Sequence, residues 1–363
     1  MKFLNYLAIA ALAVSVAFMS CKKNGNNDDD DDDDDDIDIV VDVEVDVYVL
    51  GKRGNYVALW VNGDAQDINV TDGTILMEAN SIFVSDDDVY MAGVELTQQY
   101  KVFATLWVNG IAQYLTDGTR NAGANSVFVS GDDVYVAGYG ISELYVRTAK
   151  LWINGNEQNL SDENICSAEA NSVFVLGNNV YVVGYGAYER TIATLWVNGV
   201  AQNLTDGTRD AEANSVYVVG NNVYVVGYEV SGQELTDDYG FTSYRRVAKL
   251  WINGVAQNLS DGTRDAEANS VFVAGGNVYV VGYEFNEQNK RVAKAWVNDN
   301  VSINITGGIE ANSVFVADNY VYVAGYNDNR AMLWKNGELQ NLTLDVYYDS
   351  MANSVFVVEK ETK

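Results

Sequence analysis

Short apolar runs separated by glycine, asparagine and aspartate recur along most of the chain. One representative unit, "ANSVFVSGDDVYVAGYGISELYVRTAKLWINGNEQNL", runs from Ala124 to Leu160. Its pattern predicts four short strands: "SVFV", "VYVAGY", "AKLWI" and a last one around "QNL". Asn154-Gly155 lies between the third and fourth strands, and Asn-Gly favours a tight hairpin because both residues accept positive φ. Each unit is therefore predicted to be a four-stranded antiparallel sheet.

The unit repeats with a period that predicts the blades of a β-propeller. The asparagine of "ANS" recurs in steps of 41 to 55 residues, at Asn80, Asn125, Asn171, Asn214, Asn269, Asn312 and Asn353. Repeats of this length are typical of propeller blades. The strands are apolar on both faces, and blades bury both faces of a sheet between two neighbours. A solenoid of the same period would need distinct capping repeats, and none is visible.

One tryptophan per repeat lies on the third strand, as blade-to-blade packing would require. These are Trp60, Trp107, Trp152, Trp196, Trp251, Trp296 and Trp334. The ends of the repeat region then predict how the ring closes. The chain enters on "VDVYVLG" (Val45 to Gly51), a second strand with no first strand, and leaves on "ANSVFVV" (Ala352 to Val358), a first strand with nothing after it. The predicted fold is all-β: a seven-bladed β-propeller of four-stranded blades over residues 44–360, closed by the C-terminal strand completing the N-terminal blade.

Residues 1–20 have the pattern of an export signal. Lys2 is followed by "FLNYLAIAALAVSVAFMS", and the run ends at Cys21. The stretch "FMSC" resembles the lipobox of bacterial lipoproteins, which implies lipidation of Cys21 and a membrane anchor. The alternative is an uncleaved anchor, although the run is short for a spanning helix.

Residues 21–43 are predicted to be an acidic disordered tether. The nine aspartates from Asp28 to Asp36 repel one another and bury no apolar surface. An acidic run close to a lipidated cysteine resembles the export signals of surface lipoproteins in some Gram-negative bacteria, which implies an exported protein on the outer membrane, facing outward. A plain solvated spacer and a loose calcium-binding tract are the other two readings.

Composition excludes several function classes. The net charge of −29 argues against a nucleic-acid partner held through phosphates. The chain contains no histidine, which excludes the Ser-His-Asp and Cys-His arrangements and removes the commonest zinc ligand. We predict no cofactor; a structural Ca²⁺ stays open without a motif to support it. A monomer is expected, and Cys166 has no partner for an intramolecular disulfide if Cys21 is lipidated.

The order of elements resembles kelch-type and related bacterial β-propeller repeats. The resemblance rests on the sequence of first strand, turn, "VYVVGY", long loop, "LWVNG" and short strand, from Val45 to about Glu359. It implies that "SVFV" is the innermost strand of each blade and "QNL" the outermost. It implies no particular function, because propellers host many.

Two connections are expected on one face of such a propeller, and they supply the candidate residues. The outer-to-inner connection, as in "DGTRDAEANS", places a ring of polar residues at the mouth of the central channel. The ring consists of the seven asparagines above with Glu78, Glu169, Glu212, Glu267 and Glu310; Gly123 and Met351 replace the glutamate in two copies. Such a ring would bind a cation or a sugar, or it would serve only to bond the backbone at tight inter-blade crossings.

The loop between the second and third strands differs in every repeat, and variable loops on a rigid scaffold are typical binding surfaces. The longest runs from Tyr228 to Val247, and its candidate ligand-binding residues are Tyr239, Phe241, Tyr244, Arg245 and Arg246. A harmless insertion is the alternative. The sequence therefore favours a noncatalytic propeller that binds a glycan or a protein. The other hypothesis is a polysaccharide-degrading glycosidase or lyase that uses paired carboxylates.

Overall fold

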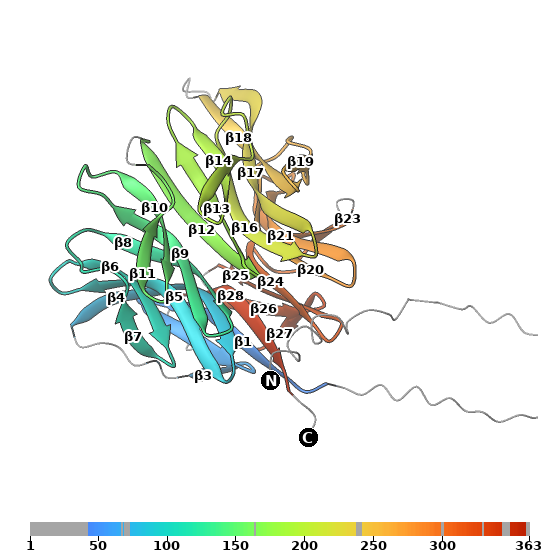
Figure 1. The fold of residues 1–363 in the computed structure, drawn as a ribbon. Coiled ribbons are helices and arrows are strands. Elements are labelled where there is room, and N and C mark those ends of the chain that lie inside the picture. Colours follow the sequence, from blue (N-terminus) through green and yellow to red (C-terminus); the bar gives the residue numbers. More distant parts are fainter. Residues whose placement is uncertain are drawn as a thin grey trace, which may run out of the picture.

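A computed structural model describes residues 43–66, 68, 73–162, 165–236, 242–298, 301–328, 330–342 and 349–360. Cys21 and the aspartate run lie outside these residues. The described chain forms seven sheets of four strands each (Figure 1).

Each sheet is one blade, numbered here in chain order and listed from its innermost strand outward. Blade 1 comprises β28 (Ser350–Glu359), β1 (Val45–Arg53), β2 (Tyr56–Val61) and β3 (Asp64–Gln66). Blade 2 comprises β4 (Thr74–Ser85), β5 (Asp88–Thr97), β6 (Val102–Val108) and β7 (Ile111–Tyr114). Blade 3 comprises β8 (Ala122–Ser130), β9 (Asp133–Ile141), β10 (Arg147–Ile153) and β11 (Asn156–Asn159). Blade 4 comprises β12 (Ser167–Leu176), β13 (Asn179–Ala187), β14 (Thr191–Val197) and β15 (Val200–Asn203). Blade 5 comprises β16 (Ala211–Val219), β17 (Asn222–Thr236), β18 (Thr242–Ile252) and β19 (Val255–Asn258). Blade 6 comprises β20 (Ala266–Ala274), β21 (Asn277–Phe285), β22 (Arg291–Val297) and β23 (Val301–Asn304). Blade 7 comprises β24 (Glu310–Ala317), β25 (Tyr320–Asn327), β26 (Arg330–Lys335) and β27 (Glu338–Gln340).

The ring closes through the two ends of the repeat region, as predicted. β28 pairs antiparallel with β1, from Val45 opposite Glu359 to Arg53 opposite Ser350. The C-terminal strand, red in Figure 1, therefore lies beside the first strand, blue, and completes blade 1. Each innermost strand also contacts those of the two neighbouring blades, with β28 lying between β24 and β4. The seven-bladed all-β fold and its closure are confirmed.

Seven separate hydrophobic cores fill the spaces between the blades. Each core joins apolar residues of one blade to the tryptophan of the next. Trp107 of β6 packs with Leu50 and Leu59 of blade 1, for example, and Trp60 of β2 packs with Leu333 of blade 7. All seven tryptophans are at most 2% exposed. The blade-to-blade role predicted for the tryptophans is confirmed.

A bulge in each innermost strand explains the glycine of "VYVVGY". In blade 4 the pairing of β12 with β13 shifts between Ala170 and Ser172, so Asn171 is the extra residue. The backbone carbonyl before the bulge comes very close to the second strand: a Cβ on Gly184 would lie 1.9 Å from the carbonyl oxygen of Glu169. Only glycine leaves room for this approach. Equivalent glycines occupy the same place in all seven blades.

The bulge turns the asparagine toward the next blade, where its side chain bonds to the backbone. Asn171 Nδ2 donates to the carbonyl oxygen of Ala213 at 3.0 Å, and all seven asparagines make the equivalent bond at 2.9–3.0 Å. The following serine accepts from a backbone N–H of the next blade, as Ser172 Oγ does from Val216 N at 3.3 Å. These two bonds recur at every seam, so "NS" holds neighbouring blades together.

An aromatic collar lines the channel below these bonds. It consists of one half-buried ring per innermost strand: Phe83, Phe128, Phe174, Tyr217, Phe272, Phe315 and Phe356. Consecutive ring centroids lie 4.7–4.9 Å apart in a closed cycle, tilted by 44–54°. Equal spacing of seven centroids gives a circle of about 5.5 Å radius, and tilted rings at this separation attract one another. The collar therefore narrows the central channel, and the contacts between its aromatic rings help to hold the seven innermost strands together.

Candidate functional site

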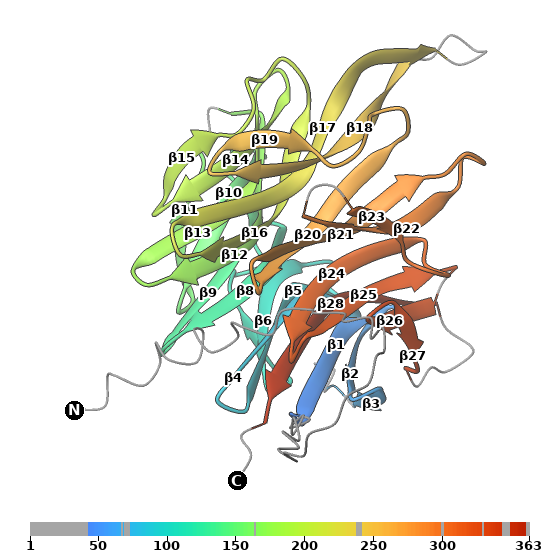
Figure 2. The same cartoon turned by 90° about the vertical axis from the view of Figure 1, so that its right-hand side faces the viewer.

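The loops between second and third strands lie beside the outer-to-inner connections on one face of the ring, called here the loop face. Hydrogen bonds from backbone N–H groups to aspartate side chains join the two: Thr191 N donates to Asp210 Oδ1 at 2.9 Å, and Arg246 N donates to Asp265 Oδ1 at 2.8 Å. The β17–β18 hairpin extends beyond the neighbouring blades on this face (Figure 2). The predicted glutamates and the variable loops therefore share one face of the molecule.

Four of the five predicted glutamates are held by the asparagine of the preceding blade. Asn125 donates to Glu169, Asn171 to Glu212, Asn214 to Glu267 and Asn269 to Glu310, at 2.9–3.0 Å between Nδ2 and Oε1. The same amide group thus bonds both a backbone carbonyl and a carboxylate. This is a structural role for both residue types, and it also fixes each carboxylate near the start of an innermost strand.

The other oxygen of these glutamates faces a tyrosine and, in three blades, an arginine. Glu310 Oε2 accepts from Tyr326 Oη at 2.7 Å and from Arg291 Nη1 at 2.5 Å. Glu169 pairs with Arg147 in the same way, and Glu267 with Arg246. These glutamates are only 14–15% exposed, which strengthens the ion pairs relative to pairs in open water.

Each arginine also covers the ring of a tyrosine in its own blade. Its guanidinium carbon lies 4.0 Å from the ring centroid of Tyr139 for Arg147, 4.3 Å from that of Tyr228 for Arg246 and 3.6 Å from that of Tyr283 for Arg291. This is a cation–π geometry. Glutamates, tyrosines and arginines thus form a polar belt, called here the Glu-Tyr-Arg belt, around blades 3 to 7.

Glu212 is the exception within the belt. Its Oε2 accepts from Tyr228 Oη at 3.2 Å, but among the described residues it has no ion pair. Burial raises its pKa above the ordinary value of 4.5, and the negative charges of Glu267 and Glu169 add to this, while hydrogen bonds from Asn171 and Tyr228 oppose it. Burial, with the charge of Glu267, also raises the pKa of Tyr283, to about 12.

The remaining predicted glutamate differs from the other four. Glu78 is 43% exposed in its side chain and lies 3.7 Å from Lys52 Nζ of blade 1. The two repeats without a glutamate carry Gly123 and Met351 at this position. Gly123 packs closely against the ring of Tyr139, where an added Cβ would lie 2.6 Å from Cε1. In the predicted ring, therefore, all seven asparagines make the same bond, whereas the glutamate is absent from two repeats and has a different environment in a third.

The residues predicted on the longest loop separate into three groups. Tyr239 and Phe241 lie outside the described residues. Tyr244 is 43% exposed, as a surface contact would require. Arg245 donates to the backbone carbonyl of Thr263, and Arg246 belongs to the Glu-Tyr-Arg belt. The two arginines thus have intramolecular partners.

Sequence reasoning missed two tyrosines at the tips of shorter loops. Tyr100 in blade 2 and Tyr145 in blade 3 are 81% and 83% exposed and have φ of +60° and +61°. Both donate N–H to the carbonyl three residues earlier, as Asn289 does in the matching turn of blade 6, where φ is +53°. Asparagine is common in this conformation, but tyrosine is not. The aligned loops "TQQYK", "SELYV" and "NEQNK" contained this signal.

A buried carboxyl in blade 2 was also missed. Glu95 is fully buried; its Oε1 accepts from Tyr114 Oη at 2.8 Å and from Thr74 Oγ1, while Oε2 has no hydrogen-bond partner. Matching glutamates in blades 5 and 6 pair with Lys249 and Lys294. In blade 2 a threonine stands at the lysine position, so comparison of the aligned repeats would have found this residue.

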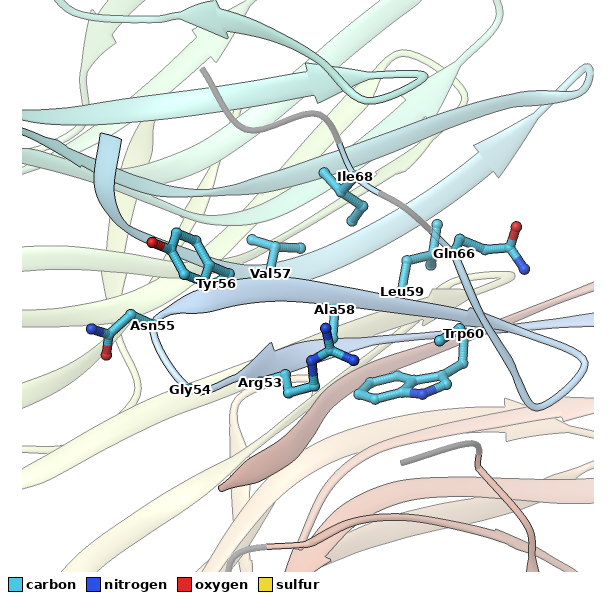
Figure 3. Close-up of a pocket in the computed structure, with 11 residues that line it drawn as sticks. Arg53, Gly54, Asn55, Tyr56, Val57, Ala58, Leu59, Trp60, Gln66 and Ile68 are labelled. Carbon is cyan, nitrogen blue, oxygen red and sulfur yellow. The ribbon is translucent and has the colours of Figure 1, made fainter. Parts of the chain in front are cut away.

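A cavity of about 550 Å³ lies at the β1–β2 hairpin of blade 1 (Figure 3). Tyr56, Arg53, Trp60 and Ile68 are among the residues around it. The chain on both sides of Ile68 lies outside the described residues, so we assign no site to this cavity. The described part of the chain holds no group of three or more metal-ligating side chains, and no helix there is long and apolar enough to cross a membrane. Cys166 is an exposed free thiol.

No protein-family model and no curated protein matches the chain, so the kelch-type similarity stays a resemblance. Several solved structures are similar to the chain over most of its length. A computationally designed protein, Ika8, is 16% identical, with 86% of this chain and 91% of that one covered and a TM-score of 0.44. A chain of a nidogen–laminin complex is 8% identical, with coverage of 86% and 98% and a TM-score of 0.43. An ulvan lyase, from a new family of polysaccharide lyases, is 12% identical, with coverage of 75% and 83% and a TM-score of 0.49.

Proposed function

We propose that the protein is a noncatalytic binding propeller of the cell envelope, which holds a glycan or protein ligand on its loop face. The observation that carries this proposal is the pair of exposed, positive-φ tyrosines at the loop tips of blades 2 and 3. Other large exposed side chains continue this surface: Leu144 beside Tyr145, Tyr188 in blade 4 and Tyr244 in blade 5.

Folding gives little reason for tyrosine at these two tips: the guanidinium carbon of Arg120 lies 5.1 Å from the ring centroid of Tyr145, and the described residues show no such contact for Tyr100. The side chains are more than four-fifths exposed, so they contribute little burial. The left-handed conformation costs a non-glycine residue about 1–2 kcal/mol, and asparagine meets the same turn geometry in blade 6. A residue that is unfavourable for its turn and unburied is best explained by contact with another molecule, and exposed aromatic side chains are common contact residues.

Enzymatic breakdown of a polysaccharide is the second candidate. Glu212 favours it, because burial raises its pKa and a general acid needs a carboxyl group that stays protonated. Such hydrolysis uses two carboxylates, however, and the neighbours Glu169 and Glu267 are each engaged with an arginine. Release of reducing ends or of unsaturated sugars from polysaccharides would support catalysis.

The envelope location is part of the proposal and rests on the signal-like residues 1–20 and on Cys21. Lipidation there would anchor the chain to a membrane, with the acidic residues 21–43 as the tether. Replacement of Cys21 by Ser should abolish fatty-acid labelling and release the protein from membranes. Unchanged labelling would refute lipidation at this residue.

The experiment for the binding face uses asparagine substitutions, which separate folding from binding. The double variant Tyr100→Asn/Tyr145→Asn should unfold at a slightly higher temperature than the wild type, because asparagine suits positive φ. It should nevertheless lose at least tenfold in affinity for the ligand identified on a glycan array or by pull-down. The matched control is Val200→Asn/Val255→Asn, which changes two residues that are each 66% exposed at hairpins of the opposite face. A tyrosine variant that binds as the wild type does would overturn the proposed face.

A further inference from the structure

The belt follows a rule that can be read from strand register. In blades 3, 5 and 6 the arginine lies two residues before the alanine that pairs with the belt tyrosine, as Arg246 does before Ala248 opposite Tyr228. Each arginine covers that tyrosine and pairs with the glutamate of the next blade. The position two residues before that alanine on each third strand, called here the arginine position, is therefore matched to a glutamate one blade ahead.

Two other blades follow the same rule. The arginine position of blade 2 is Val102, and the next blade has Gly123 in place of glutamate, so both charges are absent together. Glu78 of blade 2 also has a cation, since Lys52 supplies it from the preceding blade. For Glu78, Glu169, Glu267 and Glu310 the chain supplies a cation, and where Gly123 replaces the glutamate no arginine occupies the matched position.

Blade 4 breaks this rule. Thr191 occupies its arginine position, yet Glu212 is present in blade 5. Arg190 next to it does not substitute, because it lies outside β14 and pairs with Asp210 at 3.2 Å. Among the described residues no cation contacts Glu212, and no cation lies over the ring of Tyr185, the belt tyrosine of blade 4.

We propose that this position binds an arginine side chain of a protein ligand, with its guanidinium against Glu212 and over the ring of Tyr185. This inference deepens the proposed function and rests on it, since it names the chemistry that the loop face recognises. The three internal arginines are 32–41% exposed, so the matched position in blade 4 is open to a group arriving from solvent.

Arginine suits the position better than an ammonium group. Its planar guanidinium can donate to a carboxylate while it stacks on an aromatic ring, as the chain's own arginines do, whereas a lysine head is a compact point charge. The charge of the bound cation would also offset the burial and the neighbouring carboxylates that raise the pKa of Glu212. Geometry and electrostatics thus favour the same ligand group.

The test uses N-acetyl-arginine amide as the probe, with binding followed by saturation-transfer NMR on the purified protein. We expect one binding position per chain in the wild type. Glu212→Gln removes the charge and Thr191→Arg supplies an internal arginine, so each should raise the Kd at least tenfold. Ala201→Arg is the matched control: it adds the same charge to an exposed site on the outer strand of blade 4 and should leave the Kd within about twofold.

Two further results make the outcome decisive. Arg246→Thr removes the internal partner of Glu267 and should create a second binding position for the probe. N-acetyl-lysine amide and glucosamine should each bind more weakly than the arginine probe; tighter binding of glucosamine would overturn the choice of a protein ligand. Equal binding of the arginine probe to wild type and Thr191→Arg would overturn the site itself.

The loop-tip variant Tyr100→Asn/Tyr145→Asn separates this inference from the proposed function, because it leaves the belt unchanged. It should bind the probe as the wild type does. If the probe experiment fails while this variant still loses the macromolecular ligand, only the arginine inference is wrong. If the probe binds as expected but the variant keeps the ligand, the binding face assigned to the tyrosines is wrong.

Discussion

Removal of the closing strand should abolish cooperative folding of the whole propeller. Deletion of residues 350–363 removes β28, which pairs with β1 at nine positions. Val355 and Val357 are 3% and 5% exposed and pack with Trp60 in the core between blades 7 and 1. The loss of their burial costs about 1.5–3 kcal/mol each, and each lost ladder bond adds about 0.5–1.5 kcal/mol.

Contacts to both neighbouring blades are lost as well. Asn353 Nδ2 donates to Ala79 O of blade 2, and Val355 N donates to Ser313 Oγ of blade 7. Phe356 closes the aromatic collar between Phe315 and Phe83. The combined loss exceeds the total stability of a typical domain, which is about 5–15 kcal/mol. We therefore expect the truncated protein to show no sharp unfolding transition in urea and to bind a hydrophobic dye.

Two controls make this experiment specific to closure. Deletion of residues 361–363 alone leaves β28 in place and should keep the wild-type urea midpoint. A synthetic peptide of residues 349–363, added to the truncated protein, should restore the transition, whereas the same peptide with Val355→Ser and Val357→Ser should not. A truncated protein that unfolds cooperatively at the wild-type midpoint would refute the assigned role of β28.

Three further predictions concern single side chains. Gly184→Ala should destabilise the fold by about 3 kcal/mol or more, measured by urea unfolding, because the new Cβ would lie 1.9 Å from the Glu169 carbonyl oxygen and the backbone must shift; a loss below 1 kcal/mol would contradict the bulge geometry. Tyr114→Phe should cost about 1–3 kcal/mol in the same assay, since it removes a donor from the buried carboxyl of Glu95; an unchanged midpoint would show that this bond is unimportant. Glu212→Gln should match the wild type in stability at pH 4 and exceed it at pH 7, because a folded-state pKa raised above 4.5 costs stability as the pH rises through that window; an advantage confined to acid pH would reverse the sign and refute the assignment.

The blade architecture could be predicted from the sequence because each of its causes is repeated. Val45 to Gly51 at one end and Ala352 to Val358 at the other predicted the closure, and the Asn-Gly pairs predicted the hairpins. The unit that departs from Asn-Gly shows why the prediction was robust: Asn298 still has φ of +51° and accepts from Val278 N. The first residue of the pair thus adopts the positive φ of the turn, and its side chain also accepts a hydrogen bond from the second strand.

The partners of the polar residues could not be predicted in the same way. A repeat pattern showed that Asn214 and Glu267 recur, but not that one donates to the other across a blade seam. That contact depends on the bulge. Asn214 is the extra residue there, so its side chain points in a different direction from the one that the alternation of a regular strand would give. The sequence likewise placed Arg246 on a variable loop surface, whereas strand register pairs it with Val230, and its side chain forms an ion pair with Glu267.

Because the repeats are nearly identical, the positions at which one blade differs from the others carry the most information about function. Every seam uses the same asparagine and serine bonds, so these residues are explained by the fold. Tyr145 and Thr191 are not explained in this way, because the matching positions of other blades hold other residues: Asn289 in the equivalent turn of blade 6 and Arg246 beside the equivalent carboxylate, Glu267. Both departures lie on the loop face. On the proposed function, a ligand that contacts the loop face would account for both departures together.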